Sequence, residues 1–133
     1  GSSVSAPSRS CLITGLHTGH TTIRGNKELP VEGQHPLPSD TYTIFKMLKD
    51  KGYKTSVFGK WGLGAPMTEG APENHSVDEF FGYNCQRQAH NYYPYHLWHN
   101  DKKIVLEDNT GKNENVYAPY LIHNKALDFI KDN

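Results

Sequence analysis

LKDKGYKTSVFGKWG, at residues 48–62, carries the clearest fold signal in this chain. Apolar residues recur at helical spacing over positions 44–48, lysines follow, and Gly52 is a typical helix C-cap. Residues 53–58 are then mostly β-branched or aromatic, which predicts a short buried strand. A helix that leads into a strand across a tight glycine turn is half of a βαβ unit, so we expect an α/β fold.

The rest of the chain alternates short regular elements with long loops. The expected features are a helix over residues 8–16 that begins just after Ser5, a loop over 24–39, Ser39 or Asp40 as N-cap of the helix above, an irregular aromatic run over 64–95, a hairpin over 98–106 and a helix over 119–131. One strand and three helices are too few to complete a parallel sheet. We therefore expect a piece of a larger α/β domain.

Composition limits the function classes. The 133 residues suffice for one domain, and 14 Lys and Arg balance 14 Asp and Glu, so no basic stripe favours nucleic acid or an acidic membrane surface. No run reaches the roughly 20 apolar residues that a bilayer requires, which excludes a transmembrane helix. Cys11 and Cys85 allow at most one internal disulfide, and we favour two unpaired thiols over a bridge.

Two short segments could carry chemistry. In Ser5-Ala6-Pro7-Ser8-Arg9 a hydroxyl lies at the positive end of a helix, and Arg9 one turn later could return a planar cation to the same point, which suits sulfate or phosphate. An N-cap serine beside a surface arginine is the simpler interpretation. Lys60 follows the expected strand, at the carboxyl end where α/β sheets bind ligands; alternatively it is a solvated lysine beside a core tryptophan.

Together these segments resemble the sulfatase family, the formylglycine-dependent, arylsulfatase-like sulfuric ester hydrolases of the alkaline phosphatase superfamily. The motifs that carry the resemblance are Ser-x-Pro-x-Arg at residues 5–9, Thr-Gly at 14–15, the helix-to-strand segment at 48–55, Gly-Lys-Trp at 59–61 and SVDEFFG at 76–82. The resemblance implies an alkaline-phosphatase-like α/β fold with a central mixed sheet flanked by helices. Residues 1–133 would form part of the catalytic domain, from the nucleophile motif to the helix before a later core strand, with both flanking parts absent.

The resemblance also implies roles for individual residues. Ser5 occupies the position that maturation oxidises to formylglycine, whose hydrated aldehyde binds calcium and attacks sulfur. Arg9 would orient and charge-stabilise that group, and Lys60 would hold the sulfate oxygens. Gln86 and His90 fall in the stretch that lines the family's substrate cleft, where amide and aromatic side chains suit a sulfated carbohydrate.

Ser5 and Gly62 depart from the commonest family pattern. Many members have Cys at the position of Ser5, so Ser5 fits either a native serine-type site or a serine in place of a cysteine. Many animal members have His at the position of Gly62, whereas Gly-Lys-Trp-Gly also occurs in bacterial members. The other calcium ligands would lie outside this chain, so we expect the isolated chain to be marginally stable and catalytically silent. We assign no metal to His17 and His20.

Two other functions stay open. Unmodified Ser5 would leave a non-catalytic protein that binds sulfated glycans, and a phosphoesterase of the same superfamily would use the plain hydroxyl with zinc; calcium content would favour the sulfatase, zinc the phosphoesterase. The expected partners are a sulfate ester, with a glycan sulfate favoured, and a formylglycine-generating or anaerobic maturating enzyme. The resemblance implies a periplasmic or secreted protein if bacterial, with a lysosomal location if animal.

Overall fold

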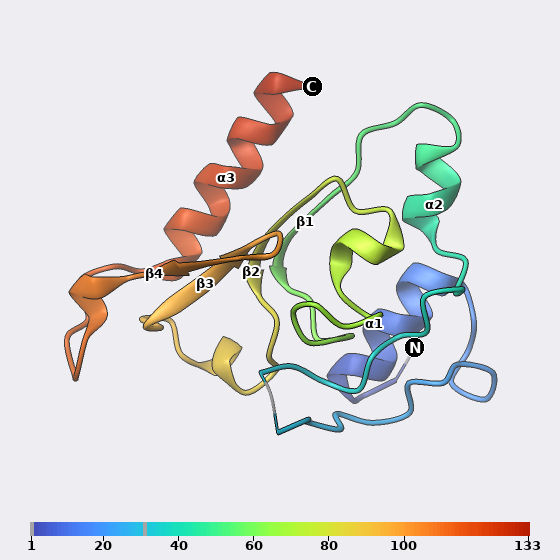
Figure 1. The fold of residues 1–133 in the computed structure, drawn as a ribbon, viewed down its shortest axis with the longest axis horizontal. Helices are drawn as coiled ribbons and strands as arrows, with labels where there is room; N and C mark the ends of the chain where they lie inside the picture. Colours follow the sequence, from blue (N-terminus) through green and yellow to red (C-terminus); the bar gives the residue numbers. More distant parts are fainter. Residues whose placement is uncertain (1, 31) are drawn as a thin grey trace.

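The computed structural model describes residues 2–30 and 32–133 (Figure 1). Its main elements are α1 (Ser5–Thr14), α2 (Ile44–Lys49), β1 (Ser56–Lys60), β2 (Glu79–Tyr83), β3 (His96–His99), β4 (Lys102–Val105) and α3 (Ala118–Asp132). Short 3₁₀ turns occur at η1 (Pro72–His75), η2 (Gln88–His90) and η3 (Glu107–Asn109). The three helices and the hairpin expected from the sequence are therefore present.

The four strands form one mixed sheet in the order β1-β2-β3-β4. β1 and β2 are parallel, with Val57 opposite Phe80 and Lys60 opposite Tyr83. The pairs β2–β3 and β3–β4 are antiparallel. A mixed sheet with helices agrees with the expected fold class.

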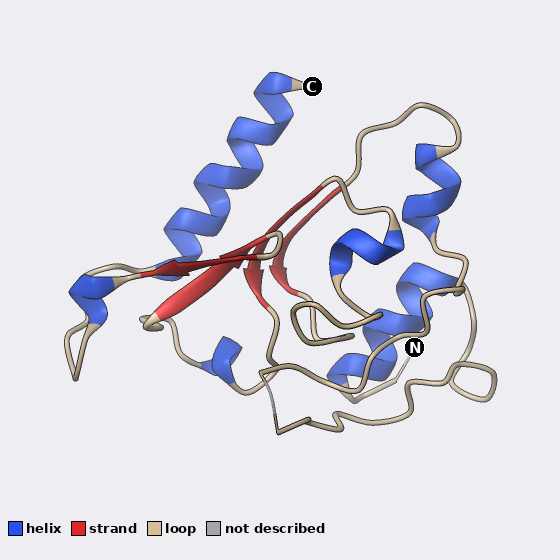
Figure 2. Cartoon of the chain, in the orientation of Figure 1, coloured by secondary structure: helices blue, strands red, loops and turns tan. Residues whose placement is uncertain are grey.

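Helices cover both faces of this sheet (Figures 1 and 2). α3 packs on one face, over a cluster that includes Phe81, Tyr83 and Leu97. α1 and α2 lie on the other side, where Phe80 and Trp61 belong to a second buried cluster. Because neighbouring residues of a strand point to opposite faces, Phe80 and Phe81 reach the two clusters separately.

The irregular run expected over residues 64–95 is wrong in part, because β2 lies within it. The strand expected over 53–58 exists but runs from Ser56 to Lys60, and its residues are half-buried rather than buried. β2 takes part in two pairings and four of its five residues are buried. The buried strand of this chain is therefore β2.

Helix starts also differ from expectation. α1 begins at Ser5 itself rather than just after it, and it ends at Thr14, two residues before the expected end. The N-cap of α2 is neither Ser39 nor Asp40 but Thr43, whose Oγ1 accepts a hydrogen bond of 3.2 Å from the amide of Lys46. Residues 38–41 form a turn instead, closed by the amide of Thr41 on the carbonyl of Pro38.

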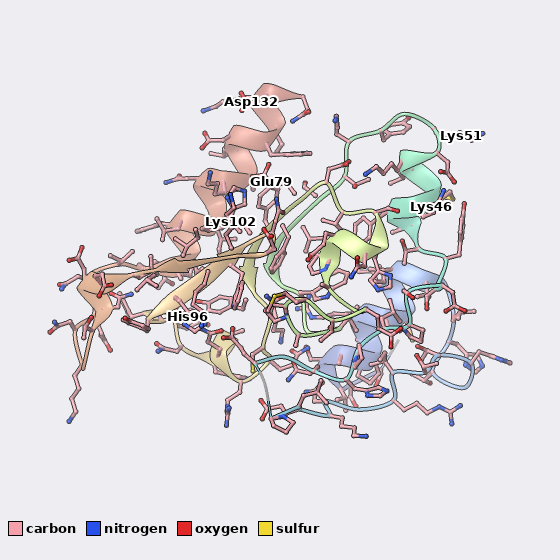
Figure 3. All side chains as sticks on the ribbon, in the orientation of Figure 1. Lys46, Lys51, Glu79, His96, Lys102 and Asp132 are labelled. Atoms are coloured by element: carbon pink, nitrogen blue, oxygen red, sulfur yellow. The ribbon has the colours of Figure 1, made fainter. Side chains whose placement is uncertain are left out.

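The hairpin expected over residues 98–106 turns at Asn100. Asn100 has a φ of 53°, and its Oδ1 accepts a hydrogen bond of 2.8 Å from the amide of Phe80, so the turn is also fixed to β2. Glu79, at the start of β2, and Lys102, at the start of β4, lie near the same end of the sheet (Figure 3). The hairpin thus continues the sheet beyond the parallel pair.

The two cysteines are free thiols, as favoured from the sequence: Cys85 is buried and Cys11 half-buried. Within residues 2–30 and 32–133, no helix combines the length and the apolar character needed to cross a membrane.

Candidate active site

Ser5 is the first residue of α1. The N-cap, Val4, is extended and offers no side-chain hydrogen bond, so the start of the helix is held from elsewhere. Asn26 does this: its Oδ1 accepts a hydrogen bond of 2.8 Å from the amide of Ala6. Pro7 follows and has no N–H that could be left unpaired. Ser5 therefore lies at a fixed helix N-terminus, where the helix dipole favours negative charge.

Ser5 and Arg9 open into the same surface hollow. The hollow has a volume of about 270 Å³ and is lined by Ser5, Ser8 and Arg9 together with residues 2–4. Both side chains are half-buried. The structure thus brings together the hydroxyl and the guanidinium that the sequence pattern pairs.

Lys60 joins them through Arg9. The Nη1 of Arg9 donates a hydrogen bond to the backbone carbonyl of Lys60, which links α1 to the carboxyl end of β1 across 51 positions of sequence. The Nε of Arg9 is buried and has no hydrogen-bond partner. A buried guanidinium with a free N–H retains donor capacity for a ligand.

Two cations near each other raise the electrostatic free energy of this site. Burial lowers the pKa of Arg9, and burial followed by repulsion from Arg9 lowers the pKa of Lys60. No carboxylate in the described part of the chain forms an ion pair with either residue. An anion bound between them would relieve both the repulsion and the unmet hydrogen bonding.

The turn after Lys60 is packed tightly. Trp61 is buried and donates from Nε1 to the carbonyl of Gly70 at 2.7 Å, so the core position considered for this residue is confirmed. Gly62 has a φ of 71°, and a Cβ there would lie 1.8 Å from the Nε2 of Gln86. Trp61 and Gln86 therefore fix the backbone that follows Lys60 from two sides.

Gln86 is 4% exposed and donates from Nε2 to the carbonyl of Gly62 at 3.3 Å. The backbone amide of Gln86 donates to the Oε1 of Gln34 at 2.9 Å. The side-chain Oε1 of Gln86 is buried and has no hydrogen-bond partner. Gln86 thus lies beneath the Lys60 turn rather than on an open surface. Its role toward substrate stays a prediction.

Three histidines lie elsewhere. His90 is exposed on η2, does not line the Ser5 hollow, and its ring forms no hydrogen bond with the described residues. The rings of His17 and His20 are 4.9 Å apart, and the Nδ1 of His17 accepts the amide of Gly19. The structure does not bring His90 to Ser5, and its substrate role also stays a prediction.

The residues of this chain do not fit a calcium ion by themselves. Calcium takes six to eight oxygen ligands, and Ser5 offers one. Within the described ranges, no three His, Cys, Asp or Glu side chains gather closely enough to hold a metal ion. A calcium site at Ser5 would need carboxylates from outside these residues, and we derive no step through it.

Sequence reasoning missed Asn26 and Gln34, both in the run that it treated as loop. Each acts over a long sequence separation, Asn26 on Ala6 and Gln34 on Gln86. An amide side chain in a glycine- and proline-rich loop gives no local signal of its partner. The bridge between Glu28 and Gln34 shows that this loop has order of its own.

A family model described as Sulfatase matches residues 1–132. The chain belongs to the sulfatase family. This sulfatase chain is 33% identical to N-acetylgalactosamine-6-sulfatase of Sus scrofa, covering 95% of this chain and 27% of that protein. It is 27% identical to N-acetylglucosamine-6-O-sulfatase of Bacteroides thetaiotaomicron, covering 97% of this chain and 19% of the relative.

Solved structures agree with this membership. A structure in complex with its substrate D-glucosamine-2-N,6-O-disulfate superposes with a TM-score of 0.70 at 26% identity, over 98% of the sulfatase chain and 22% of its counterpart. The structure of Ps i-CgsB in complex with a neocarrahexaose has the same TM-score at 24% identity, over 96% of this chain and 31% of that one, and supports the fold. The chain spans less than a third of each protein compared here.

Proposed function

We propose that the protein hydrolyses sulfate esters of carbohydrates and that this chain supplies the nucleophile position and two sulfate-binding cations. The observation that carries the proposal is the joining of Arg9 to Lys60 next to Ser5, with no carboxylate paired to either cation in the described residues. Membership of the sulfatase family supports sulfate over other anions. The names of the pig and bacterial relatives support a 6-sulfated amino sugar as the substrate class.

Ser5 is the position at which we propose a formylglycine. Oxidation of its CH₂OH to an aldehyde removes two protons and two electrons, and the acceptor of the maturating enzyme takes up the electrons. Once hydrated, that group supplies a nucleophilic oxygen at the helix N-terminus. Arg9 contributes a fixed positive charge on one side of it, and Lys60 contributes a second charge to hold the sulfate oxygens.

Ser5 is tested by mass spectrometry of its peptide from the full-length protein made in its native host. We expect a peptide lighter by the mass of two hydrogen atoms than the encoded sequence. An unmodified serine in a protein whose gene encodes serine would overturn formylglycine and favour glycan binding without turnover. A gene that encodes cysteine would identify Ser5 as a substitution in an active enzyme.

Arg9 and Lys60 are tested by sulfate release from N-acetylgalactosamine 6-sulfate by the full-length protein. Loss of one fixed charge that stabilises the transition state lowers kcat on the order of 10²–10³-fold, so we expect that loss for Arg9→Gln and for Lys60→Gln. Arg24→Gln, which removes a cation outside the hollow, is the matched control and should keep the full rate. Equal rates for all three variants would contradict the assigned roles.

We further propose a periplasmic or secreted location for a bacterial source and a lysosomal one for an animal source.

A further inference from the structure

A second hollow lies away from Ser5, between residues 91–95 and the loop that joins β4 to α3. It has a volume of about 550 Å³, within the range of small-molecule sites. Its lining includes Tyr93, Tyr95, Asn113, Lys112 and Glu114, and we call it the tyrosine pocket. The loop between β4 and α3 lies at the opposite end of the molecule's longest axis from α1 (Figure 1).

Tyrosine side chains gather at and beside the tyrosine pocket. Two tyrosines line the pocket: Tyr95 is 49% exposed, and Tyr93 is half-buried. Tyr117 extends the group, with ring centroids 5.9 Å from Tyr92 and 5.4 Å from Tyr93. Exposed tyrosines offer an apolar ring face and a polar hydroxyl at low cost in conformational entropy.

The walls of the tyrosine pocket are held in place before any ligand binds. Asn109 is buried, and its Nδ2 donates to the carbonyls of Pro94 at 3.0 Å and Val116 at 2.9 Å, which ties the two walls together. Its Oδ1 accepts the amides of Asn115 and Val116. Pre-organised walls lower the entropy cost of binding.

Tyr83 holds the wall formed by residues 91–95 from a second side. Its hydroxyl donates to the carbonyl of Asn91 at 2.9 Å, and burial raises the pKa of Tyr83 to about 12, so that it remains a neutral donor. The amide of Ala118, at the start of α3, donates to the carbonyl of Tyr92. Residues 91–95 are thus anchored to β2 and to α3.

The charges in the tyrosine pocket differ from those near Ser5. Among the described residues that line it, Lys112 is the cation and Glu114 the carboxylate, so the lining carries no net charge. Arg9 and Lys60, by contrast, present positive charge alone. Aromatic faces with amides and balanced charge suit an uncharged sugar ring, which stacks through its C–H face and hydrogen-bonds through its hydroxyls.

We propose that the tyrosine pocket binds a pyranose residue of a glycan through stacking on Tyr93 and Tyr95, independently of the sulfate site. The choice of a glycan rests on the proposed function. A glycan chain that is held at this pocket and is long enough to reach α1 would keep its further sulfated units at a raised local concentration around Ser5.

The experiment measures, by titration calorimetry, the binding of two sulfate-free probes to the full protein. The probes are desulfated chondroitin oligosaccharides and N-acetylheparosan oligosaccharides. We expect Tyr95→Ala to weaken binding about threefold to tenfold, the range that one lost ring contact gives, and Tyr95→Phe to keep most of the affinity. Tyr53→Ala is the matched control, because Tyr53 is 62% exposed outside the tyrosine pocket. Arg9→Gln should leave this binding unchanged.

Desulfated probes separate the two proposals. If sulfate hydrolysis fails while desulfated oligosaccharides still bind in a manner that depends on Tyr95, the sulfatase activity is wrong and the tyrosine pocket stands. No binding of either oligosaccharide, or equal binding by wild type and Tyr95→Ala, would overturn the tyrosine pocket. Binding of a protein partner in place of the oligosaccharides would overturn it too.

Discussion

The guanidinium of Arg9 donates a hydrogen bond to the backbone carbonyl of Lys60, so the helix that carries Ser5 is fastened directly to the end of β1. This bond fixes the backbone of Lys60 against the guanidinium of Arg9, and the ammonium of Lys60 extends from that fixed point on its own side chain. The backbone of Lys60 cannot move away from Arg9 without breaking a charge-assisted hydrogen bond. The anion site therefore depends on the packing of α1 against the sheet.

Arg9→Gln should raise the pKa of Lys60 toward its ordinary value, because repulsion from Arg9 contributes to the lowered pKa. The expected change is seen by following the ε-methylene NMR signals of Lys60 through an alkaline titration. Arg24→Gln removes a cation that does not contribute to the pKa of Lys60 and should leave it unchanged. A Lys60 titration that is identical in wild type and Arg9→Gln would refute the coupling.

Gly62→Ala should destabilise the fold more than Gly15→Ala. Both glycines have a φ of 71°, so an alanine at either costs about 1–2 kcal/mol of backbone strain. At Gly15 no atom lies within 4 Å of an added Cβ, whereas at Gly62 the Nε2 of Gln86 lies at 1.8 Å. We expect an additional loss of about 1–3 kcal/mol at Gly62, measured by urea unfolding.

Gln86→Ala, added to Gly62→Ala, should recover part of that additional loss, because it removes the atoms that clash. Equal unfolding free energies for Gly62→Ala and Gly15→Ala would mean that Gln86 moves aside freely and does not fix the Lys60 turn.

His75 should make the fold sensitive to acid. It is 2% exposed, both ring nitrogens lack a hydrogen-bond partner, and burial lowers its pKa below 6.5 against a smaller opposing effect from Leu37 and Glu69. Below the unfolded pKa the unfolded chain binds the proton more readily, so stability falls as the pH drops. The loss is at most about 1.4 kcal/mol per pH unit for one group.

The check for His75 is the free energy of unfolding at pH 5 and pH 7.5. His75→Phe should lose less stability over this interval than wild type, whereas His17→Gln, at an exposed position, should lose as much as wild type. The same loss in His75→Phe and wild type would assign the acid sensitivity to other groups.

Asp78 should contribute more to the free energy of unfolding than the similar surface carboxylate Asp50 does. A hydrogen bond from Lys49 lowers the pKa of Asp78, and its Oδ2 accepts the amide of Thr55 at 3.0 Å. Asp50 pairs with Lys46 within a helix turn on an exposed surface. We expect a loss of about 1–2 kcal/mol for Asp78→Ala and about 0.5 kcal/mol or less for Asp50→Ala.

The stability that Asp78 provides is present above the carboxyl's unfolded pKa and is lost as the pH falls through its lower folded pKa. Thermal unfolding between pH 2 and pH 6 measures this. If the difference between wild type and Asp78→Ala did not shrink toward pH 2, the ionised carboxylate would not be the source of the stability.

Local patterns predicted the helices and the hairpin well. α3 has apolar residues at helical spacing over 15 positions, and the turn at Asn100 has a typical turn residue with positive φ. β2 gave no such signal, because its residues EFFGY are apolar on both faces and lie within an aromatic run. Its parallel partner β1 is more than 20 positions away, so its pairing is not encoded locally.

A motif with both residue type and spacing placed three site residues near one another, although their roles stay predictions. Ser5, Arg9 and Lys60 were named from the sequence, and the structure places Ser5 and Arg9 in one hollow and joins Arg9 to Lys60. Asn26 could not be found in this way, because only the folded chain brings its side chain to the amide of Ala6.

The two edge strands of the sheet, β1 and β4, differ in how easily another strand can add to them. β4 carries exposed Lys102 and Lys103, and such lysines discourage the addition of another strand. β1 is paired on one side alone among the described residues, and its charged residue, Lys60, lies at its end. When made by itself, the chain therefore has a template along β1 for strands of other copies, and its yield as a monomer will fall as its concentration rises.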